Sequence, residues 1–322
     1  MKTRNKIFSG AIALGILSGA LPALAFPNGP IEFTIPFGAG GGADIEGRLL
    51  AKEMSKVLGV AVTPVNKPGG GGAITYTYIT NSKPNGQVIA WNSTSVLTTT
   101  NLGNTAFDYD AMDHIGRVEY QPQPFVVKAG AKWNSFKEFV ADCKAAPGTL
   151  KVANSGTGSS THTAAIMLMN AAGCEVIHLP KGIKGRNKSV LNGEAHAMIA
   201  PLTGAVRLTK AKKLKILLMP TAERSPLFPD VPTAKEIGYN VELDLFRGLS
   251  VAKGTPAAIK SKLADAMTKA ANSNAFMALA KKKGFTVSPM GHKAFTAYLA
   301  DEDTKVKNIF KSAKLYRSKK PK

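Results

Sequence analysis

The sequence predicts an α/β fold with two domains, each a mostly parallel sheet flanked by helices, and a ligand cleft between them. Three observations carry this prediction. Short β-branched or aromatic runs alternate with segments of helical apolar spacing, as in parallel sheets that are covered by helices. The chain has 322 residues, enough for two separate cores. A proline-containing break at Gln121–Pro124 separates two such α/β series.

The first series opens with a strand over 32–37, a glycine-rich turn, and a helix over 44–58 whose apolar residues recur at helical spacing. Residues 92–100 carry many hydroxyl groups and are expected to form a polar loop. The other expected elements of this series are a strand over 60–65, a helix over 73–81, and strands over 87–91 and 114–119.

The second series follows the proline break. Its expected elements are strands over 125–128, 150–153, 175–179, 195–199 and 214–219, helices over 135–145, 161–172 and 187–191, and a turn over 181–185. The run 241–250 is expected to return the chain to the first domain. We therefore assign 26–121 and 243–322 to domain 1 and 122–242 to domain 2, with crossovers near 121–124 and 240–246. Two lobes joined in this way form a cleft and a hinge.

The first 25 residues have the features of a secretory signal peptide. A basic start at residues 1–6 precedes an apolar run at 7–21, and Ala23-Leu-Ala25 is a small-x-small cleavage site. The apolar run is short for a membrane span and is interrupted by Ser18 and Pro22. We expect cleavage before Phe26 and export to the periplasm.

The chain is strongly basic, with a formal net charge of +21, which becomes +18 when the three basic residues of the signal peptide are removed. Such an excess is compatible with nucleic acid, an anionic membrane surface or a small anion, but export argues against nucleic acid. Cys143 and Cys174 are far apart and lack metal-ligand spacing. In an oxidising compartment they can form one disulfide or remain two buried thiols.

The glycine run after the first strand predicts an anion-binding site. Unpaired N–H groups at a helix start and the helix dipole attract anions, and glycine allows close approach to the backbone. Gly38–Ala43 also fits the dinucleotide pattern G-x-G-x-x-A, but Asn66-Lys67 stands where an acidic residue would bind ribose. The phosphate-loop pattern fails because Arg48-Leu49 follows Gly47 instead of Lys-Ser/Thr.

A second glycine-rich loop, Asn154–His162, again lies between a strand and a helix. Serines beside His162 are compatible with a hydrolase, but no G-x-S-x-G motif is present and sequence neighbours do not make a triad. The five histidines show no metal-ligand spacing. Arg247, which follows Phe246 at the return to the first domain, is either a carboxylate clamp or a surface arginine. We find no catalytic set, and we expect no metal and no cofactor.

Several segments, in this order and spacing, resemble the periplasmic substrate-binding proteins of tripartite tricarboxylate transporters, the Bug family. The segments are Ile35–Asp44, Asn66–Gly72, Pro84–Gly86, Asn154–His162, His178–Gly182, Phe228–Thr233 and Lys253–Pro256. The resemblance covers essentially the whole mature chain. It implies a type II-like periplasmic binding fold that captures a di- or tricarboxylate or related organic acid anion. It also implies delivery to two integral membrane components, and we expect a monomer. An exported hydrolase and a ligand-sensing domain are the alternatives.

The resemblance also implies which residues bind the ligand. In the family, the loop after the first strand and the serine-glycine loop grip carboxylates. The Asp44 side chain is expected to point away from the anion. The family's Pro-Tyr-Lys-Gly is shortened to Pro180–Gly182, so that Lys181 would supply a charge there. The full candidate set is Phe37, Gly38, Ala39, Gly40, Gly41, Gly42, Ala43, Asp44, Ser93, Thr94, Ser155, Gly156, Thr157, Gly158, Ser159, Ser160, His162, Lys181, Phe246 and Arg247.

Overall fold

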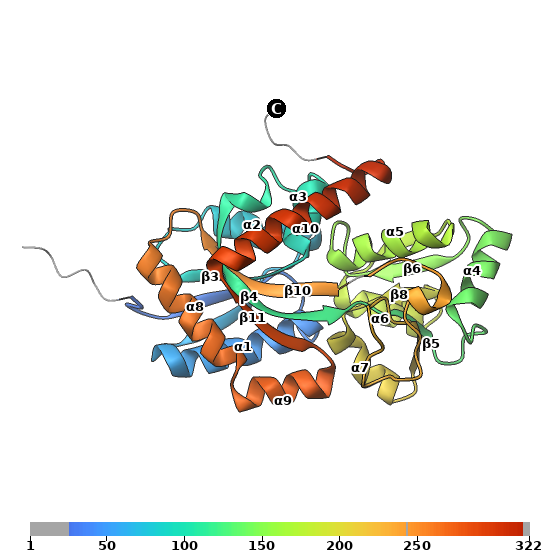
Figure 1. Ribbon diagram of the computed structural model, residues 1–322, viewed down its shortest axis with the longest axis horizontal. Coiled ribbons are helices and arrows are strands. Elements are labelled where there is room, and N and C mark those ends of the chain that lie inside the picture. Colours follow the sequence, from blue (N-terminus) through green and yellow to red (C-terminus); the bar gives the residue numbers. More distant parts are fainter. Residues whose placement is uncertain (1–25, 243, 318–322) are drawn as a thin grey trace, which may run out of the picture.

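A computed structural model describes residues 26–242 and 244–317, which form two lobes, each built on one β-sheet (Figure 1). The predicted signal peptide, residues 1–25, lies outside the described part. Within the described part, no helix combines the length and the apolar character that crossing a membrane requires.

The first lobe contains a six-stranded sheet in the order β11-β4-β10-β3-β1-β2. Helices α1, α8 and α9 pack on one face of this sheet, and α2, α3 and α10 pack on the other (Figure 1). The strands are β1 (Ile31–Ile35), β2 (Val62–Asn66), β3 (Val88–Ser93), β4 (Met112–Pro122), β10 (Asp244–Ala252) and β11 (Thr286–Gly291). The helices are α1 (Gly42–Leu58), α2 (Ala73–Thr80), α3 (Ser95–Asn101), α8 (Ala257–Ala271), α9 (Asn274–Lys283) and α10 (His292–Ser312), with 3-10 turns η1 (Gly70–Gly72) and η2 (Tyr109–Ala111).

The second lobe contains a five-stranded sheet in the order β7-β6-β8-β5-β9. Helices α4 and α5 cover one face, and α6 and α7 cover the other. The strands are β5 (Phe125–Lys128), β6 (Lys151–Asn154), β7 (Ile177–Pro180), β8 (Ala197–Ile199) and β9 (Leu214–Leu218). The helices are α4 (Phe136–Ala145), α5 (Ser160–Ala172), α6 (Gly182–Leu191) and α7 (Leu202–Lys210), with the 3-10 turn η3 (Lys235–Ile237).

The two-domain α/β class is confirmed, but the sheets are not mostly parallel as predicted. β1 is parallel to β2 and β3, whereas β10 is antiparallel to β3 and β4, and β11 is antiparallel to β4. In the second sheet, β5 is antiparallel to β8 and β9. Strands β5 and β10 are the first strands after the chain changes lobe. They do not enter the sheet through a strand-helix-strand crossover, which is what makes neighbouring strands parallel.

The chain passes between the lobes twice, from β4 to β5 and from β9 to β10. The two passages lie side by side, since Asp244 at the start of β10 pairs with Pro122 at the end of β4. Figure 1 shows β4 and β10 reaching from one lobe toward the other. The sequence-based domain boundaries at residues 122 and 243 remain a prediction.

Two expected irregular segments near the cleft are helical. Residues 95–101 form α3, because the threonine hydroxyls donate back to carbonyls of the preceding turn instead of competing with the helix. Thr99 Oγ1 donates to the Ser95 carbonyl at 2.6 Å, and Thr100 Oγ1 donates to the Val96 carbonyl at 2.9 Å. The expected turn at 181–185 is the first part of α6, which begins at Gly182.

Cys143 on α4 and Cys174 just after α5 form a disulfide, with Cα atoms 5.7 Å apart. The bond closes a segment with a sequence separation of 31 residues, so restriction of the unfolded chain contributes about 3–4 kcal/mol. This settles the alternative left open by the sequence. The crosslink lies in the core of the second lobe beneath the helix that carries the second glycine-rich loop.

Candidate functional site

Two adjoining cavities lie between the lobes. The outer cleft has a volume of about 670 Å³ and is lined from both lobes, by residues that include Gly69–Gly71 and Ser155–Thr157. The inner pocket has a volume of only about 20 Å³, room for one water-sized group. Both cavities are lined by Phe37, Ser155 and Ile183. A ligand that fills the outer cleft can therefore extend a small group into the inner pocket.

The start of α1 forms one wall of the inner pocket, through Gly42 and Ala43. No described side chain caps this helix at Gly41, so the N–H groups of its first turn are left for another acceptor. The Asp44 carboxylate is occupied elsewhere: it accepts hydrogen bonds from the Gly40 N–H at 2.9 Å and from Arg48 Nε at 2.8 Å. These bonds fix the conformation of the loop, and the N-terminus of α1, the positive end of the helix dipole, faces the pocket.

The start of α5 forms the opposite wall, through Ser159, Ser160 and Thr161. Ser159 is the N-cap, and its hydroxyl accepts the His162 N–H at 3.3 Å. The Thr161 hydroxyl accepts the Ser155 N–H at 2.9 Å, which folds the loop back over the helix start. The positive ends of two helices from different lobes thus converge on the inner pocket, an arrangement suited to an anion.

Arg186 of α6 also lines the inner pocket, although its side chain is almost fully buried, with 1% exposure. Its Nη1 donates to Ser155 Oγ at 2.7 Å and its Nε donates to Asn187 Oδ1 at 3.3 Å. Among the described residues it forms no ion pair. Burial lowers the pKa of Arg186 to about 10, so the guanidinium remains charged at neutral pH.

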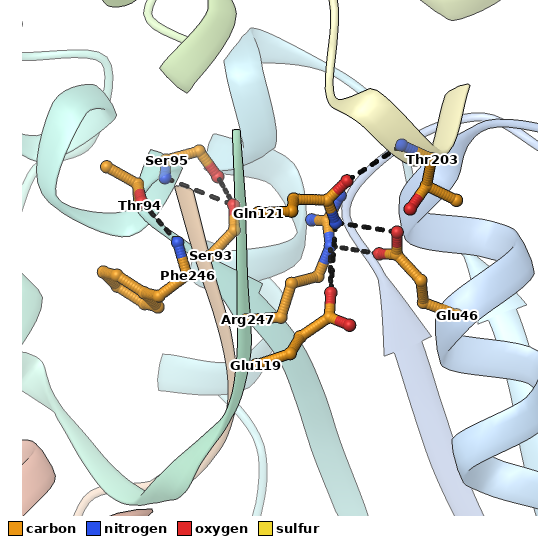
Figure 2. A network of polar contacts seen from close by, with 9 residues as sticks. All are labelled: Glu46, Ser93, Thr94, Ser95, Glu119, Gln121, Thr203, Phe246 and Arg247. Carbon is orange, nitrogen blue, oxygen red and sulfur yellow. Dashed lines mark hydrogen bonds and ion pairs between the residues drawn. The ribbon is translucent and has the colours of Figure 1, made fainter. Parts of the chain in front are cut away.

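Arg247 borders the inner pocket from β10, but its charge is paired inside the protein (Figure 2). Its Nε donates to Glu46 Oε2 of α1 at 2.6 Å, and Glu119 Oε1 of β4 lies 3.8 Å away. Gln121 Nε2 donates to Glu46 at 2.7 Å and to Glu119 at 3.1 Å. Gln121 Oε1 accepts the Thr203 N–H at the start of α7, which ties the network to the second lobe. Burial and the neighbouring Glu46 raise the pKa of Glu119 well above its ordinary value, which favours its neutral form.

A family model described as "Tripartite tricarboxylate transporter family receptor" (TctC) matches residues 47–315 of this chain. The chain belongs to this family. A UPF0065 protein from Cupriavidus necator is 32% identical over 274 residues, 83% of each chain. Periplasmic binding protein BugD is similar in structure, with a TM-score of 0.86, 26% identity, and coverage of 90% of this chain and 99% of that one.

MatC from Rhodopseudomonas palustris, solved with bound malate, shares the fold at 23% identity, with a TM-score of 0.83. The match covers 88% of this chain and 99% of MatC. The resemblance to the Bug family inferred from the sequence is therefore confirmed, together with the two-domain fold. The family consists of periplasmic solute-binding receptors.

In this TctC-family receptor, half of the candidate residues line the two cavities. They are Phe37, Gly38, Gly42, Ala43, Ser155, Gly156, Thr157, Ser159, Ser160 and Arg247. Ala39 and Gly40 face a separate depression beside α6, and the Ile183 side chain covers Gly41. Gly158 and Asp44 support the two loops through hydrogen bonds rather than lining the cavities.

Phe246, Ser93, Thr94 and Lys181 lie outside both cavities. Phe246 packs against Phe295 of α10, because consecutive strand residues face opposite sides of the sheet and Arg247 takes the side toward the pocket. The Thr94 hydroxyl accepts the Phe246 N–H at 3.0 Å, and the buried Ser93 hydroxyl bonds that of Ser95 (Figure 2). Lys181 forms an ion pair with Glu194. These four residues are better explained by packing and local pairing than by ligand binding.

The sequence-based candidate set omitted two parts of the receptor's cleft. The third glycine run, at 69–71, lines the outer cleft next to Asn104, whose Nδ2 donates to the Thr157 carbonyl at 3.2 Å across the lobes. A strand-glycine-helix pattern at 62–80 was available to identify it. Arg186 and Ile183 carry no such signal, because the basic segment that contains them predicts only a turn and a short helix.

His162 supports the second loop and does not act as a cation. Its Nδ1 accepts the Gly158 N–H at 3.2 Å, and burial together with the nearby His178 lowers the pKa of His162 to about 4. A histidine whose folded pKa lies below its unfolded value stabilises the protein above pH 6.5, and this contribution is lost as the pH falls toward 4.

We therefore expect the free energy of unfolding to fall between pH 6.5 and 4.5, by roughly 1–2 kcal/mol on account of His162. His162→Asn keeps a hydrogen-bond acceptor near Nδ1 but does not titrate, and it should reduce this fall by that amount. Urea denaturation of both proteins at intervals of half a pH unit measures the difference. Parallel curves for the two proteins would show that His162 is already protonated or has an ordinary pKa.

Proposed function

We propose that this chain is a periplasmic receptor that captures a small organic acid anion, such as a dicarboxylate, a tricarboxylate or a related carboxylate, in the cleft between its domains. It delivers the anion, as a monomer, to the two integral membrane components of a tripartite tricarboxylate-type transporter. The observation that carries this proposal is the convergence of the starts of α1 and α5, from different lobes, on one inner pocket. Membership of the receptor family supports it.

Binding follows from this geometry without any covalent step. The ligand's acid group accepts N–H hydrogen bonds from both helix starts, and each helix dipole stabilises the negative charge. Because the two helices belong to different lobes, an acid group between them favours the conformation in which the lobes are together. A ligand shifts that equilibrium by the difference between its affinities for the two conformations.

The pocket geometry gives no support to the alternative of a hydrolase. Among the described residues, no serine that lines the inner pocket bonds a histidine ring. The Ser159 hydroxyl lies 3.0 Å from that of Thr161, and the Ser155 hydroxyl accepts from Arg186. Nucleophilic catalysis requires a serine beside a positioned base. A ligand-sensing domain would use the same cleft but would contact a signalling protein instead of a transporter.

Thermal unfolding of the mature protein, residues 26–322, tests the proposal. The panel comprises malate, succinate, adipate, citrate, butanoate, hexanoate, benzoate and phthalate. An acid present at 100 times its Kd contributes about 2.7 kcal/mol, which raises the midpoint by several degrees. The methyl esters of the same acids are the matched controls and should produce no shift. Absence of any shift across the panel, with hydrolysis of an ester, would reject the receptor in favour of an enzyme.

A further inference from the structure

The charge on Arg186 is unusual because it is buried and no described residue supplies a counter-ion. Its side chain has 1% exposure, and its two hydrogen-bond partners, Ser155 and Asn187, are both neutral. In the part of the chain that the structure describes, no carboxylate pairs with it. An uncompensated buried charge costs several kcal/mol of stability. Such a residue is explained when an anion that is not part of the chain pairs with it.

The other charges at the inner pocket cancel one another. Arg247 is paired with Glu46, and Glu119 is held toward its neutral form by burial and by Glu46. Asp44 is turned away toward Arg48. Counting the described residues, the pocket therefore keeps one positive charge, that of Arg186, in addition to the two helix starts. One ionised acid group compensates that charge.

The outer cleft carries no charged side chain among the described residues that line it. Its walls are glycine, proline, Phe37, Ile183 and the neutral polar side chains of Asn104, Ser155 and Thr157. A second ionised carboxylate placed there would lose hydration and gain no ion pair. An uncharged ligand body, by contrast, fits a cavity of about 670 Å³ with apolar and backbone walls.

We propose that Arg186 is the charge anchor of the binding site, and that the preferred ligand is a monocarboxylate. Its single ionised carboxylate lies at the junction of the two cavities, with one oxygen in the inner pocket toward Arg186, and its uncharged body lies in the outer cleft. This inference deepens the proposed function and rests on it. It narrows the ligand class from organic acids in general to acids with one charged group.

Matched pairs of acids test the ligand class. Butanoate and succinate, hexanoate and adipate, and benzoate and phthalate have the same carbon skeleton apart from the second acid group. Titration calorimetry on the mature protein at pH 7.5 should give tighter binding for the monocarboxylate, by tenfold or more, in every pair that binds. Equal or tighter binding of the diacid would overturn the inference while leaving the receptor function intact. Failure of all eight acids of the thermal panel to bind, malate and citrate included, would instead reject the proposed function.

Three variants test the role of Arg186. Arg186→Met removes the charge at similar volume and should weaken binding of the best monocarboxylate at least 30-fold, whereas Arg186→Lys should recover part of the loss. Arg207→Met removes one positive charge from the exposed side of α7 and should change affinity less than twofold, which excludes a general field effect.

The stability of the ligand-free Arg186 variant distinguishes a ligand-binding role for Arg186 from a structural role. Because no carboxylate in the described part of the chain pairs with this arginine, ligand-free Arg186→Met should unfold at the same midpoint as the unchanged protein or at a higher one. A lower midpoint, or an affinity within threefold of the unchanged protein, would show that Arg186 serves the fold and not the ligand.

Discussion

Replacing Gly71 with alanine is expected to weaken ligand binding by about 100-fold or more, while the protein remains folded. Gly71 belongs to the glycine run at 69–71, which lies in the first lobe and faces the glycine-rich loop Asn154–His162 of the other lobe. A Cβ added there would lie 2.6 Å from the Thr157 carbonyl oxygen and 2.7 Å from the Ser159 nitrogen. Both are backbone atoms, which cannot move aside as a flexible side chain can.

The clash lies between lobes, so the lobes can relieve it by separating. Alanine at this position therefore favours the open conformation and leaves each core intact. When the lobes separate, other contacts across the same junction are lost as well, including the hydrogen bond from Thr98 Oγ1 to the Gly158 carbonyl at 2.5 Å. A ligand that needs the N–H groups of both helix starts would then keep those of one lobe only. A 100-fold loss of affinity corresponds to about 2.7 kcal/mol of binding free energy.

Gly59→Ala is the matched control, because it separates steric blocking from backbone strain. Gly59 ends α1 with φ of 71°, nearly the same as the 72° of Gly71, but a Cβ there would meet no heavy atom within 4 Å. Both variants should lose about 1 kcal/mol of stability from the left-handed backbone. Only Gly71→Ala should bind the ligand more weakly. Only this variant should also fail to show the decrease in radius of gyration that the ligand causes, as measured by X-ray scattering. Equal affinities for the two variants would contradict a closing cleft.

The parts of the site that could be predicted from the sequence are those with a local signal. The loops at 37–44 and 154–160 combine a strand end, glycines and a helix start. Such a combination favours anion binding in any protein, because the backbone N–H groups at the helix start are free. The threonine-rich helix α3 was harder to predict, because hydroxyl groups can bond the backbone in either a loop or a helix. Its packing against α10 in the core favours the helix.

The charge pattern of the site could not be predicted, because it depends on partners far apart in the sequence. Arg247 and Glu46 are 201 positions apart, and only the fold brings them together. Without knowledge of Glu46, Arg247 is as consistent with a ligand clamp as with an internal ion pair. Conversely, Arg186 lies in a segment rich in lysine, where one more basic residue suggests a solvated surface. Its burial results from the position of α6 against β6 and β8.

Replacing Arg247 with methionine is expected to lower the free energy of unfolding by about 3–5 kcal/mol. Arg247 is 2% exposed, and Glu46 and Glu119 beside it are fully buried. Methionine fills a similar volume, so the main loss is the charge that compensates Glu46. Removing one member of a buried ion pair leaves the other charge without solvent and without a partner.

The loss should also depend on pH, through Glu119. Arg247 lowers the pKa of Glu119, whereas burial and Glu46 raise it, so removal of the arginine raises it further. A carboxyl group with a raised folded pKa contributes stability that is lost as the pH rises through that pKa. The deficit of Arg247→Met should therefore be larger at pH 8 than at pH 5, as measured by urea denaturation at each pH.

The double variant Glu46→Gln/Arg247→Met tests the buried pair directly, since it removes both charges and keeps an acceptor for Gln121. We expect it to regain most of the stability lost by Arg247→Met, with a coupling energy of about 2–4 kcal/mol in a double-mutant cycle. If the two substitutions were simply additive, the buried pair would contribute nothing, and Arg247 would have to be reconsidered as a ligand-binding residue. Recovery of stability would leave Arg186 as the cation of the inner pocket that has no partner within the described chain.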